Sequence, residues 1–468
     1  MIDWEKEGDA CVSLLGDLIR IPTVNRGTRG EGDGNERPAA ELLAEYFRKA
    51  GMEPTLVEKE KGRTSVVARV RGTGKKAPIL LNAHLDVVEV DESKWTHPPF
   101  AGEIHDGYLW GRGTIDMKHM AAMSACVMRL LQANADAGKP LERDVIFAGV
   151  ADEEAGCHLG AHYLVNEHPE LIRAEYMLGE IGAFSQHMLG RTFYPIQVAE
   201  KGTVWVRATF SGDTGHGSMP DRNSSVVKLG RAIERLGRKH FPVHPTKVVS
   251  TFFEEIARAL PAPQKQIVAR LKKTEVAAFL VRYVLRDPAM KRTFAPLLSN
   301  TASPTVARAG AKVNVIPSTG TLEIDGRTLP GQSETSFLRE LQEVMQEDAR
   351  LDVFNSAPAV ETSTDTEMYV HLANILRKHD PAGHPLPYMI PGFTDAKAYA
   401  RIGTKCYGFS PVKFDPTHDI VFSKMYHGND ERVPVPGLRW GVRVLYDAVS
   451  SFARGELLGA GPGATPST

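Results

Sequence analysis

Three short apolar segments, each followed closely by a residue that can bind a metal ion or carry a proton, constrain this chain more than any other feature of its sequence. The segments and the residues that follow them are 79–83 with His84, 145–150 with Asp152-Glu153-Glu154, and 176–178 with Glu180. Each segment has the length of a buried strand, and helical patterns alternate with them. This alternation predicts an α/β fold whose sheet has mixed or parallel strands. Because ligands bind beyond the carboxyl ends of such strands, we expect these side chains to share one site.

The pattern changes near residue 200, which predicts a second domain inserted into the first. The chain has 468 residues, too many for one ordinary core. Two strand–helix units predict a small α+β sandwich, with strands at 203–211 and 320–325 and helices at 224–239 and 333–350. The expected organisation is a main domain at 1–199 and 358–458, an inserted domain at 200–357 with a helical excursion at 250–298, and a disordered tail at 459–468.

Composition and charge narrow the class of protein. Hydrophobic residues make up 42% and charged residues 24% of the chain, a balance typical of a globular protein. The formal net charge of -1 leaves no basic excess for phosphates, so we expect no nucleic-acid partner. No apolar stretch approaches the ~20 residues that span a bilayer, and the N-terminus lacks a signal-peptide pattern, so we expect no membrane partner. The four widely spaced cysteines favour free thiols, a reducing compartment and a cytoplasmic location.

Imidazole and carboxylate side chains at six positions are candidates for a metal centre. They are His84, Asp116, Glu153, Glu154, Glu180 and His427. This mixture of nitrogen and oxygen ligands suits zinc or a similar divalent ion. One carboxylate could bridge a pair of ions about 3.5–4 Å apart, which together polarise a carbonyl and share a hydroxide.

Each of these signals alone has a simpler explanation, because such residues are more often structural or solvent-exposed. The alternatives are a structural pair of His84 with Asp86, an N-cap at Asp116, a helix start or solvated face at Glu153-Glu154, a surface position for Glu180, and a pair of His427 with Glu431. The order and spacing of the whole set favour the metal centre over these alternatives.

Two neighbours of the candidate ligands have separate roles in this interpretation. If His84 is a ligand, the carboxylate of Asp86 can hold its second ring nitrogen and fix its tautomer. Of the adjacent Glu153 and Glu154, one would bind metal and the other would stay free to take a proton from a water molecule. Nearby carboxylates can raise the pKa of such a base.

In combination, these motifs resemble the di-zinc peptidase family M20, which contains aminoacylase, carboxypeptidase S, acetylornithine deacetylase, succinyl-diaminopimelate desuccinylase and glutamate carboxypeptidase. The resemblance extends from about Leu18 to Val435, nearly the whole chain. It implies a zinc-peptidase-like catalytic domain, with a mixed sheet flanked by helices, and an inserted α+β sandwich that serves as a lid or dimerisation domain. It also implies two Zn2+ ions, for which Co2+ or Mn2+ could substitute.

The resemblance assigns a role to each candidate at the metal centre. It implies that Glu153 is the general base and that Asp116 bridges the two ions, and family members often have a cis peptide just after that aspartate. The other assignments it implies are His84 and Glu180 on the first ion, Asp86 behind His84, and Glu154 and His427 on the second ion.

Two residues of the inserted domain also have counterparts in the family. His216, in residues 212–220, resembles a histidine that in dimeric members reaches the neighbouring subunit's site and polarises the scissile carbonyl. Arg327 resembles an arginine that grips the substrate carboxylate, a role that suits a guanidinium fork. Without the resemblance, we would expect Arg327 to pair with Asp325 and His216 to make a local hydrogen bond.

Further positions match the family less closely. Asn314, otherwise a turn residue, matches an asparagine that contacts substrate, and Gly392 and Thr394 match a loop that lines the pocket. One glycine of that loop is Phe393 here, which narrows the pocket or makes it more apolar. His119-Met120 stands where many relatives have Gly-Gly, which leaves the geometry after Asp116 open and makes His119 an unusual candidate for an extra ligand.

These observations predict an enzyme that hydrolyses an amide or peptide bond adjacent to a free carboxylate, as a carboxypeptidase or dipeptidase does. An aminoacylase that hydrolyses N-acyl amino acids is the alternative, and a non-catalytic metal-binding relative is a more distant one. The excursion at 250–298 resembles the carboxypeptidase S and aminoacylase branch, which favours small peptides or N-acyl amino acids with apolar groups. The resemblance at His216 also makes a homodimer an expectation.

Overall fold

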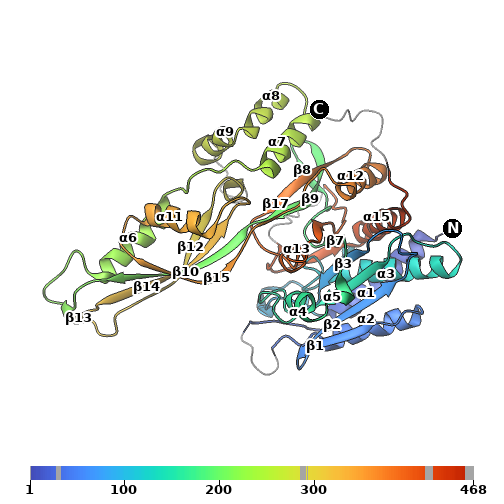
Figure 1. Ribbon diagram of the computed structural model, residues 1–468, viewed down its shortest axis with the longest axis horizontal. Coiled ribbons are helices and arrows are strands. Elements are labelled where there is room, and N and C mark those ends of the chain that lie inside the picture. Colours follow the sequence, from blue (N-terminus) through green and yellow to red (C-terminus); the bar gives the residue numbers. More distant parts are fainter. Residues whose placement is uncertain (1, 28–32, 285–290, 292–293, 417–424, 459–468) are drawn as a thin grey trace. The chain divides into compact units, whose positions relative to one another are not determined.

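In the computed structural model, which describes residues 2–27, 33–284, 291, 294–416 and 425–458, the chain forms two compact units (Figure 1). The first comprises Met1–Val198, Thr362–Pro387 and Thr394–Thr468, and the second comprises Ala199–Glu361 and Tyr388–Phe393. Residues 388–393, which we assigned to the main domain from the sequence, therefore group with the second unit. The expected disordered tail at 459–468 lies outside the described residues.

A mixed sheet forms the core of the first unit. Its strands follow the order β1-β2-β6-β3-β7-β18-β9-β16, and β8 and β17 also pair with β9. β3 runs parallel to β6 and β7, and β18 runs parallel to β7, whereas β2 is antiparallel to β6. The predicted mixed α/β sheet is confirmed. The strands are β1 Thr55–Glu60, β2 Arg63–Val70, β3 Ile79–His84, β6 Val145–Val150, β7 Tyr176–Gly179, β8 Gln186–Met188, β9 Arg191–Glu200, β16 Val360–Glu361, β17 Gly383–Ile390 and β18 Lys405–Gly408, with a small separate sheet of β4 Ile104–His105, β5 Tyr108–Trp110 and β19 Arg432–Pro434.

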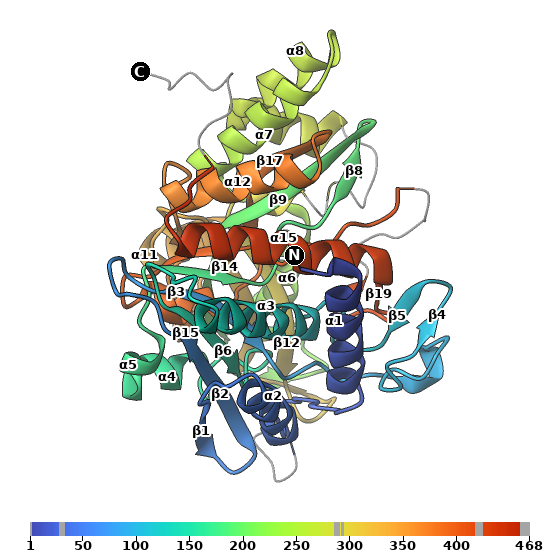
Figure 2. The ribbon, with the colours of Figure 1, turned by 90° about the vertical axis from the view of Figure 1, so that its right-hand side faces the viewer.

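Helices cover this sheet. α1, α3 and α15 pack against one another, and α3 contacts β2, β3 and β6 (Figure 2). α13 contacts α4, β7 and β18 (Figure 1). Because neighbouring elements cover them, β3 and β6 are buried along their whole length, which explains their nearly unbroken apolar sequences. The helices are α1 Trp4–Ile19, α2 Arg37–Lys49, α3 Lys118–Asp136, α4 Ala161–Glu167, α5 Pro169–Ile172, α12 Glu367–His379, α13 Ala396–Ala400 and α15 Val435–Ala453, with a short 3-10 turn at Glu92–Lys94.

The carboxyl ends of β3, β6 and β7 meet at one edge of this sheet. In the parallel register, His84 pairs with Val150 of β6, and Leu81 pairs with Leu178 of β7. The residues that follow the three strands therefore emerge side by side, as the sequence predicted.

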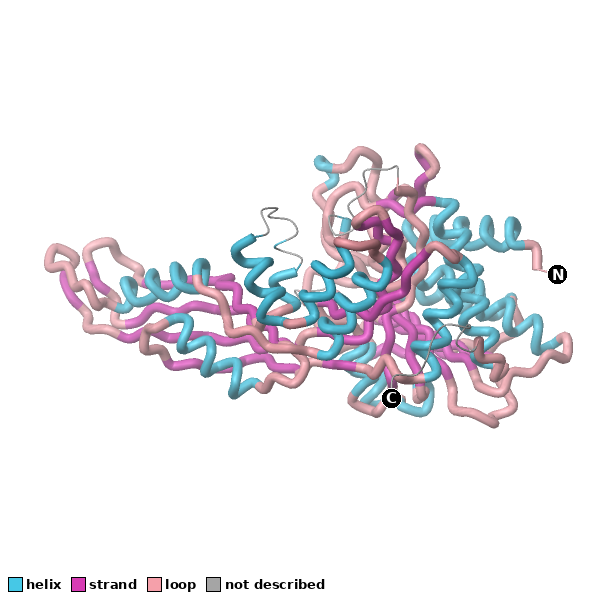
Figure 3. Tube along the Cα trace, turned by 90° about the horizontal axis from the view of Figure 1, so that it is seen from above, coloured by secondary structure: helices cyan, strands magenta, loops and turns pink. Residues whose placement is uncertain are grey.

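An antiparallel sheet in the order β12-β14-β10-β15 forms the second unit, and α6 and α11 lie along it (Figure 3). Alternate residues of β10, from Val204 to Phe210, are buried in a core with side chains of both helices. This is the predicted α+β sandwich. Its elements are β10 Gly202–Ser211, β11 Gly215–His216, β12 Thr301–Ala309, β13 Val315–Ile316, β14 Thr319–Thr328, β15 Arg350–Ala357, α6 Ser225–Arg238 and α11 Glu334–Met345.

Two strands and one helix end of this unit differ from the prediction. β12 and β15 were not predicted, because both are edge strands with largely exposed side chains and at most a short apolar alternation. The helix expected to reach residue 350 ends at Met345, where Gln346 adopts a left-handed conformation with a φ of 51°.

The helical excursion is present within the described residues. It contains α7 Lys247–Ala259, α8 Gln264–Ala269 and α9 Thr274–Phe279, with short 3-10 or π turns at Arg270–Lys272, Leu280–Val284 and Ala295–Leu297. Among the helices of the described chain, none combines the length and apolar character needed to cross a membrane. The four cysteines, all in the described part of the chain, are buried and form no disulfide, as predicted.

His371 in α12 provides a pH test of the packing between α12 and α15. Its Nδ1 accepts the N–H of Leu458 at 3.3 Å and its Nε2–H donates to the carbonyl of Ala448 at 3.1 Å, which fits a neutral ring. Burial lowers the pKa of His371 from 6.5 to about 4. Between these pH values the unfolded chain binds a proton that the folded chain does not. The contribution of the neutral His371 ring to the free energy of unfolding is therefore complete above pH 6.5 and decreases as the pH falls toward 4.

We expect the loss to be on the order of 3 kcal/mol for the wild-type protein. Urea denaturation of the wild type and of His371→Gln across this pH range measures it, and the variant should lose less stability because its amide does not titrate. The same pH dependence in both proteins would contradict the assignment.

Candidate metal centre

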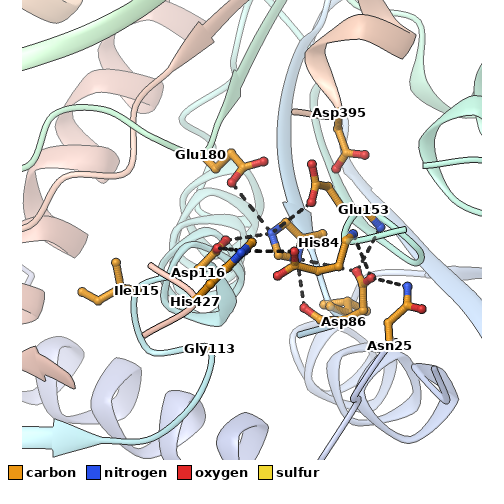
Figure 4. A network of polar contacts seen from close by, with 12 residues as sticks. Asn25, His84, Asp86, Gly113, Ile115, Asp116, Glu153, Glu180, Asp395 and His427 are labelled. Carbon is orange, nitrogen blue, oxygen red and sulfur yellow. Dashed lines mark hydrogen bonds and ion pairs between the residues drawn. The ribbon is translucent and has the colours of Figure 1, made fainter. Parts of the chain in front are cut away.

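The four candidate carboxylates, of Asp116, Glu153, Glu154 and Glu180, each lie within 4.0 Å of an imidazole nitrogen of His84 or His427. The Nε2 atom of His84 lies 3.0 Å from Oδ1 of Asp116, 3.8 Å from Glu180 and 4.0 Å from Glu153. All six residues belong to the first unit, and Figure 4 shows them gathered in one cluster. The sequence-based grouping therefore corresponds to one cluster in space.

Asp116 lies between the two imidazoles. Its Oδ1 faces His84, while its Oδ2 lies 3.3 Å from Nε2 of His427, which is also 3.2 Å from Glu154. Two overlapping sets of ligand atoms have the spacing of a metal site, each within 4.8 Å: His84, Asp116 and Glu154, and His84, Glu153 and Glu180. A carboxylate with each oxygen directed at a different imidazole has the arrangement expected of a ligand shared by two ions.

The donor atoms of this cluster fit divalent ions. The Nδ1–H of His84 donates to the backbone carbonyl of Asp86 at 3.0 Å, which leaves Nε2 of the neutral ring as a lone pair directed at the Asp116 carboxylate. Two acceptors at that distance repel unless a proton or a cation lies between them. In addition, one buried oxygen each of Glu154 and Glu180, the Oε1 atom, has no hydrogen-bond partner.

The pKa shifts within the cluster also favour binding of divalent ions. Burial raises the pKa of Glu154 to about 7 and that of Glu180 to about 8, with the Asp116 charge adding to both. Burial and the Glu180 charge also raise the pKa of Glu153. The contacts with Asp116 and Glu154 raise the pKa of His427 to about 10. Without metal ions these groups are held together only by shared protons, a role that divalent cations can replace.

Asp86 is positioned differently from the expectation. Its carboxylate lies 3.6 Å from Nδ1 of His84, which bonds instead to the Asp86 backbone carbonyl. The carboxylate oxygens are already taken, because they accept the N–H groups of Glu153 and Glu154 at 3.1 Å and the side-chain amide of Asn25 at 2.8 Å. Asp86 thus fixes the turn that carries the two glutamates, and its backbone fixes the histidine tautomer.

Two details after Asp116 answer questions that the sequence left open. The Asp116–Met117 peptide is cis, as the resemblance implied. His119 is buried, and burial lowers its pKa to about 4. Among the described residues, His119 belongs to neither of the two sets of ligand atoms. The alternative pair of His427 with Glu431 is wrong, because the Glu431 carboxylate binds Arg112 at 2.7 Å.

A buried polar network behind the cluster was missed in the sequence. Asn25 donates to Asp152 at 3.3 Å as well as to Asp86, and Arg63 pairs with Asp152 at 3.1 Å and with buried Glu36 at 2.7 Å. These residues come from separate loops and the start of β2 and share no recognisable motif. A single sequence therefore carries no signal for them.

Asn82 and Asp395 form a second missed contact, and here a signal existed. Asn82 interrupts the apolar run of β3, and a buried amide requires partners. It donates to the Asp395 carboxylate at 2.8 Å and accepts the Tyr399 hydroxyl at 2.7 Å. Asp395 follows Thr394 in the predicted pocket loop and lies close to Glu153 (Figure 4). The pair anchors that loop to β3.

The predicted substrate-binding residues of the second unit make local contacts. His216 is exposed and its Nδ1 lies 2.8 Å from the Ser218 hydroxyl, and the carbonyl of exposed Asn314 accepts the N–H of Gly217 at 2.9 Å. These contacts match the alternatives of a local hydrogen bond and a turn. Gly392 belongs to the second unit and buried Thr394 to the first.

Arg327 is paired with Asp325, the alternative considered from the sequence. Its Nε and Nη2 donate to the two carboxylate oxygens at 2.7 and 3.1 Å, and the Trp205 indole N–H donates to the same carboxylate at 3.0 Å. The Phe393 ring lies 5.7 Å from the guanidinium carbon. The bidentate edge expected to bind substrate is therefore occupied, while the buried Nη1 has no hydrogen-bond partner.

Comparison with known proteins agrees with this arrangement. Residues 80–451 match the sequence profile described as peptidase family M20/M25/M40. The chain belongs to this family. An M20 relative, the N-fatty-acyl-amino acid synthase/hydrolase PM20D1 of Xenopus tropicalis, is 27% identical over 92% of this chain and 83% of its own length.

Solved structures of M20 proteins share the fold. The metallo-carboxypeptidase Sso-CP2 from Sulfolobus solfataricus has a TM-score of 0.67 and 17% identity, covering 96% of this chain and 99% of that one. The YXEP protein of Bacillus subtilis, described as a dinuclear metal binding peptidase from the M20 family, has a TM-score of 0.57 and 12% identity, covering 96% and 99%. The mixed sheet and the separate antiparallel sheet are therefore those of M20 peptidases.

If the cluster binds divalent ions, zinc should stabilise the folded chain. A ligand that binds only the native state adds about 2.7 kcal/mol at a free concentration of about 100 times its Kd. We expect calorimetry of metal-free protein to show a higher Tm when zinc is added and a return to the original Tm with chelator. Asp116→Asn should lose the response to zinc, and the same Tm for the wild type with zinc and with chelator would contradict the metal centre.

Proposed function

We propose that this M20 protein is a zinc-dependent hydrolase that cleaves an amide or peptide bond adjacent to a free carboxylate, in the manner of a carboxypeptidase or dipeptidase. The observation that carries the proposal is Asp116, whose two oxygens face His84 and His427 inside a cluster of buried carboxylates. The descriptions of Sso-CP2 as a metallo-carboxypeptidase and of YXEP as a dinuclear metal binding peptidase support it.

The proposed ligands divide into two sets that share Asp116. His84, Asp116 and Glu180 would hold the first ion, and Asp116, Glu154 and His427 would hold the second; Co2+ or Mn2+ could replace zinc. When bound, such ions supply Lewis-acid polarisation of the scissile carbonyl and lower the pKa of a water molecule. The chain's own contribution is to hold the ligands in place and to move the proton.

Glu153 is the proposed proton carrier. Its carboxylate is farther from His84 than that of Asp116 or Glu180, at 4.0 Å, which leaves it the least engaged acid of the cluster. Burial and the Glu180 charge raise the pKa of Glu153, which suits a group that must accept a proton and then give it up. Glu153 takes the proton of the attacking water and delivers it to the leaving amine nitrogen, while Asp86 fixes its backbone.

Arg327 is the proposed anchor for the substrate carboxylate. Because Asp325 occupies the Nε and Nη2 edge, the carboxylate would bind through Nη1, which has no partner. Asn314, Gly392 and Thr394 complete the proposed substrate-binding set. His216 donates to the developing oxyanion in this scheme, from the partner subunit of a homodimer.

N-acyl amino acids are the second candidate class of substrate. Phe393, where many relatives have glycine, places an aromatic ring 5.7 Å from the Arg327 guanidinium and thus an apolar surface beside the proposed carboxylate anchor. The name of the Xenopus tropicalis relative, an N-fatty-acyl-amino acid synthase/hydrolase, supports the same class. A non-catalytic metal-binding relative is the remaining alternative, and the intact set of ligands together with Glu153 argues against it.

The partners and the cellular location that we propose rest on the net charge and the cysteines of the chain. With a net charge of -1, we propose a small-molecule substrate and no nucleic-acid or membrane partner. Four free, buried cysteines favour a reducing, cytoplasmic location.

Replacing Glu153 separates catalysis from metal binding. We expect Glu153→Ala to keep both zinc ions and to lose turnover by several orders of magnitude, because the proton carrier is absent while the ligands remain. The measurements are zinc content and kcat/KM on a panel of dipeptides and N-acyl amino acids. Each substrate is paired with its carboxamide, which should be a poor substrate if a free carboxylate is required.

The adjacent residue provides the matched control. Glu154→Ala removes a proposed ligand and should lose zinc as well as activity. Turnover of Glu153→Ala within about tenfold of the wild type would exclude the general-base role, and wild-type protein that holds zinc but hydrolyses no substrate would favour the non-catalytic alternative. Preference within the panel distinguishes peptidase from aminoacylase.

His216 tests the shared site. We expect the His216→Ala and Glu153→Ala proteins to be inactive separately and to recover part of the activity when their subunits are mixed and exchanged, because a mixed dimer contains one site with both residues intact. Sedimentation verifies that dimers exchange. No recovery from exchanged dimers would count against a histidine supplied by the partner.

A further inference from the structure

Glu431 has a buried carboxyl group that receives several hydrogen bonds from the loop that ends at Asp116. Arg112 donates to Oε2 at 2.7 Å, and the N–H of Gly113 lies 3.1 Å from both oxygens. The backbone N–H groups of Ile115 and Asp116 donate to Oε1 at 2.6 and 3.0 Å. Glu431 itself is 0% exposed. One side chain therefore fixes the backbone on both sides of the loop's turn.

The same loop is tied back to the segment that follows His427. Arg112 donates through Nη2 to the carbonyl of Gly428 at 2.8 Å, and the N–H of Gly111 donates to the carbonyl of Glu431 at 3.0 Å. Loop 111–116 and segment 428–431 are thus joined by a backbone–backbone hydrogen bond and by side-chain hydrogen bonds that start from each of the two segments.

The loop depends on Glu431 because its own geometry provides few alternatives. Gly113 has a φ of 93°, outside the range of regular strands and helices, so the N–H groups around it have no neighbouring ladder to join. Removing the acceptor would leave buried N–H groups and the buried Arg112 charge unpaired, each a costly loss.

The ligands of the cluster differ in how they are held. His84 is the last residue of β3 and Glu180 follows β7 directly, so the parallel sheet positions both. His427 lies in a turn, outside any strand or helix, and its side chain is 57% exposed. The pairing of Arg432 with Trp110 between β19 and β5 brings its segment beside the loop that ends at Asp116, and the contacts of Arg112 and Glu431 extend this connection to Asp116 itself.

We propose that Glu431 is a positioning residue that sets Asp116 and His427 opposite each other before any ion binds, and so determines the affinity for the ion held by Asp116, Glu154 and His427. The inference rests on the proposed function, since it concerns ligands assigned there. Glu431 does not touch substrate or metal in this scheme.

The test compares two amide substitutions. Glu431→Gln keeps the size of the side chain but turns an amide N–H toward Arg112, whereas Glu175→Gln removes a matched 2.7 Å pair with buried Arg143, at the amino end of β7 and away from the cluster. We measure zinc stoichiometry and affinity against a competing chelator, and the visible spectrum of the Co2+ forms.

We expect Glu175→Gln to bind two ions, each with the same affinity as the wild type. Glu431→Gln should keep the ion of His84 and Glu180 and bind the other about 10–100 times more weakly, with a changed Co2+ spectrum for that ion. Wild-type affinity for both ions in Glu431→Gln would overturn the inference. A wild-type protein that binds no pair of ions would overturn the proposed function, and the inference with it.

A measurement on unmodified protein covers the case in which Glu431→Gln does not fold. In metal-free wild type, the amides of Gly113, Ile115 and Asp116 should exchange their hydrogens slowly, because their acceptor is present without metal. Exchange at the rate of an exposed loop would show that the metal, and not Glu431, orders this loop, and would overturn the inference.

Discussion

The concentration of buried acidic side chains at the carboxyl ends of the parallel strands β3, β6 and β7 is the constraint on which the rest of the structure depends. The side chains of Asp116, Glu153, Glu154 and Glu180 are each at most 8% exposed. Like charges this close cannot all ionise in a medium of low dielectric constant. The imidazoles of the cluster are too few to neutralise them, so the arrangement is stable either with shared protons or with cations. A fold that brings such groups together gains binding energy for divalent ions, at a cost to its own stability when they are absent.

The protein meets this constraint with two kinds of support. Parallel pairing of β3 with β6 and β7 places ligands at strand ends, where backbone hydrogen bonds fix their spacing. The remaining ligands lie on loops, and buried carboxylates organise these: Asp86 accepts the N–H groups of the turn at Glu153, and Glu431 accepts those of the loop at Asp116. Carboxylates that bind backbone N–H groups are satisfied without metal, whereas those that face the imidazoles are not. Acids of the same type thus separate into structural and reactive groups according to their partners.

The sequence was sufficient for features that depend on local patterns and insufficient for those that depend on remote partners. The apolar runs of β3 and β6 and the residues that follow them were recognisable, because burial and chemistry leave marks on adjacent positions. The edge strand β12 was not, since exposed residues carry no period. Glu431 was considered only as a partner for His427, because its true partners near Arg112 lie more than three hundred positions away. Asn25 and Arg63 had no signal, and the role of Asp86 toward the Glu153 turn required coordinates.

At Arg327 the structure adds a contact that bears on the proposed binding of a substrate carboxylate, because Asp325 already pairs with the guanidinium. A guanidinium favours bidentate binding of a carboxylate, and in this protein Asp325 already provides one. A substrate carboxylate that binds Nη1 can use the N–H groups of that nitrogen, which have no partner, but its Coulombic attraction to Arg327 is partly cancelled by the charge of Asp325. Asp325, which also accepts the Trp205 N–H, holds the Arg327 guanidinium at one edge. The guanidinium therefore has little rotational freedom left to lose when substrate binds. If Arg327 is the carboxylate anchor, as proposed, selection for a free carboxylate would depend less on its charge than on the fixed direction of its Nη1 group, beside the Phe393 ring 5.7 Å from the guanidinium carbon.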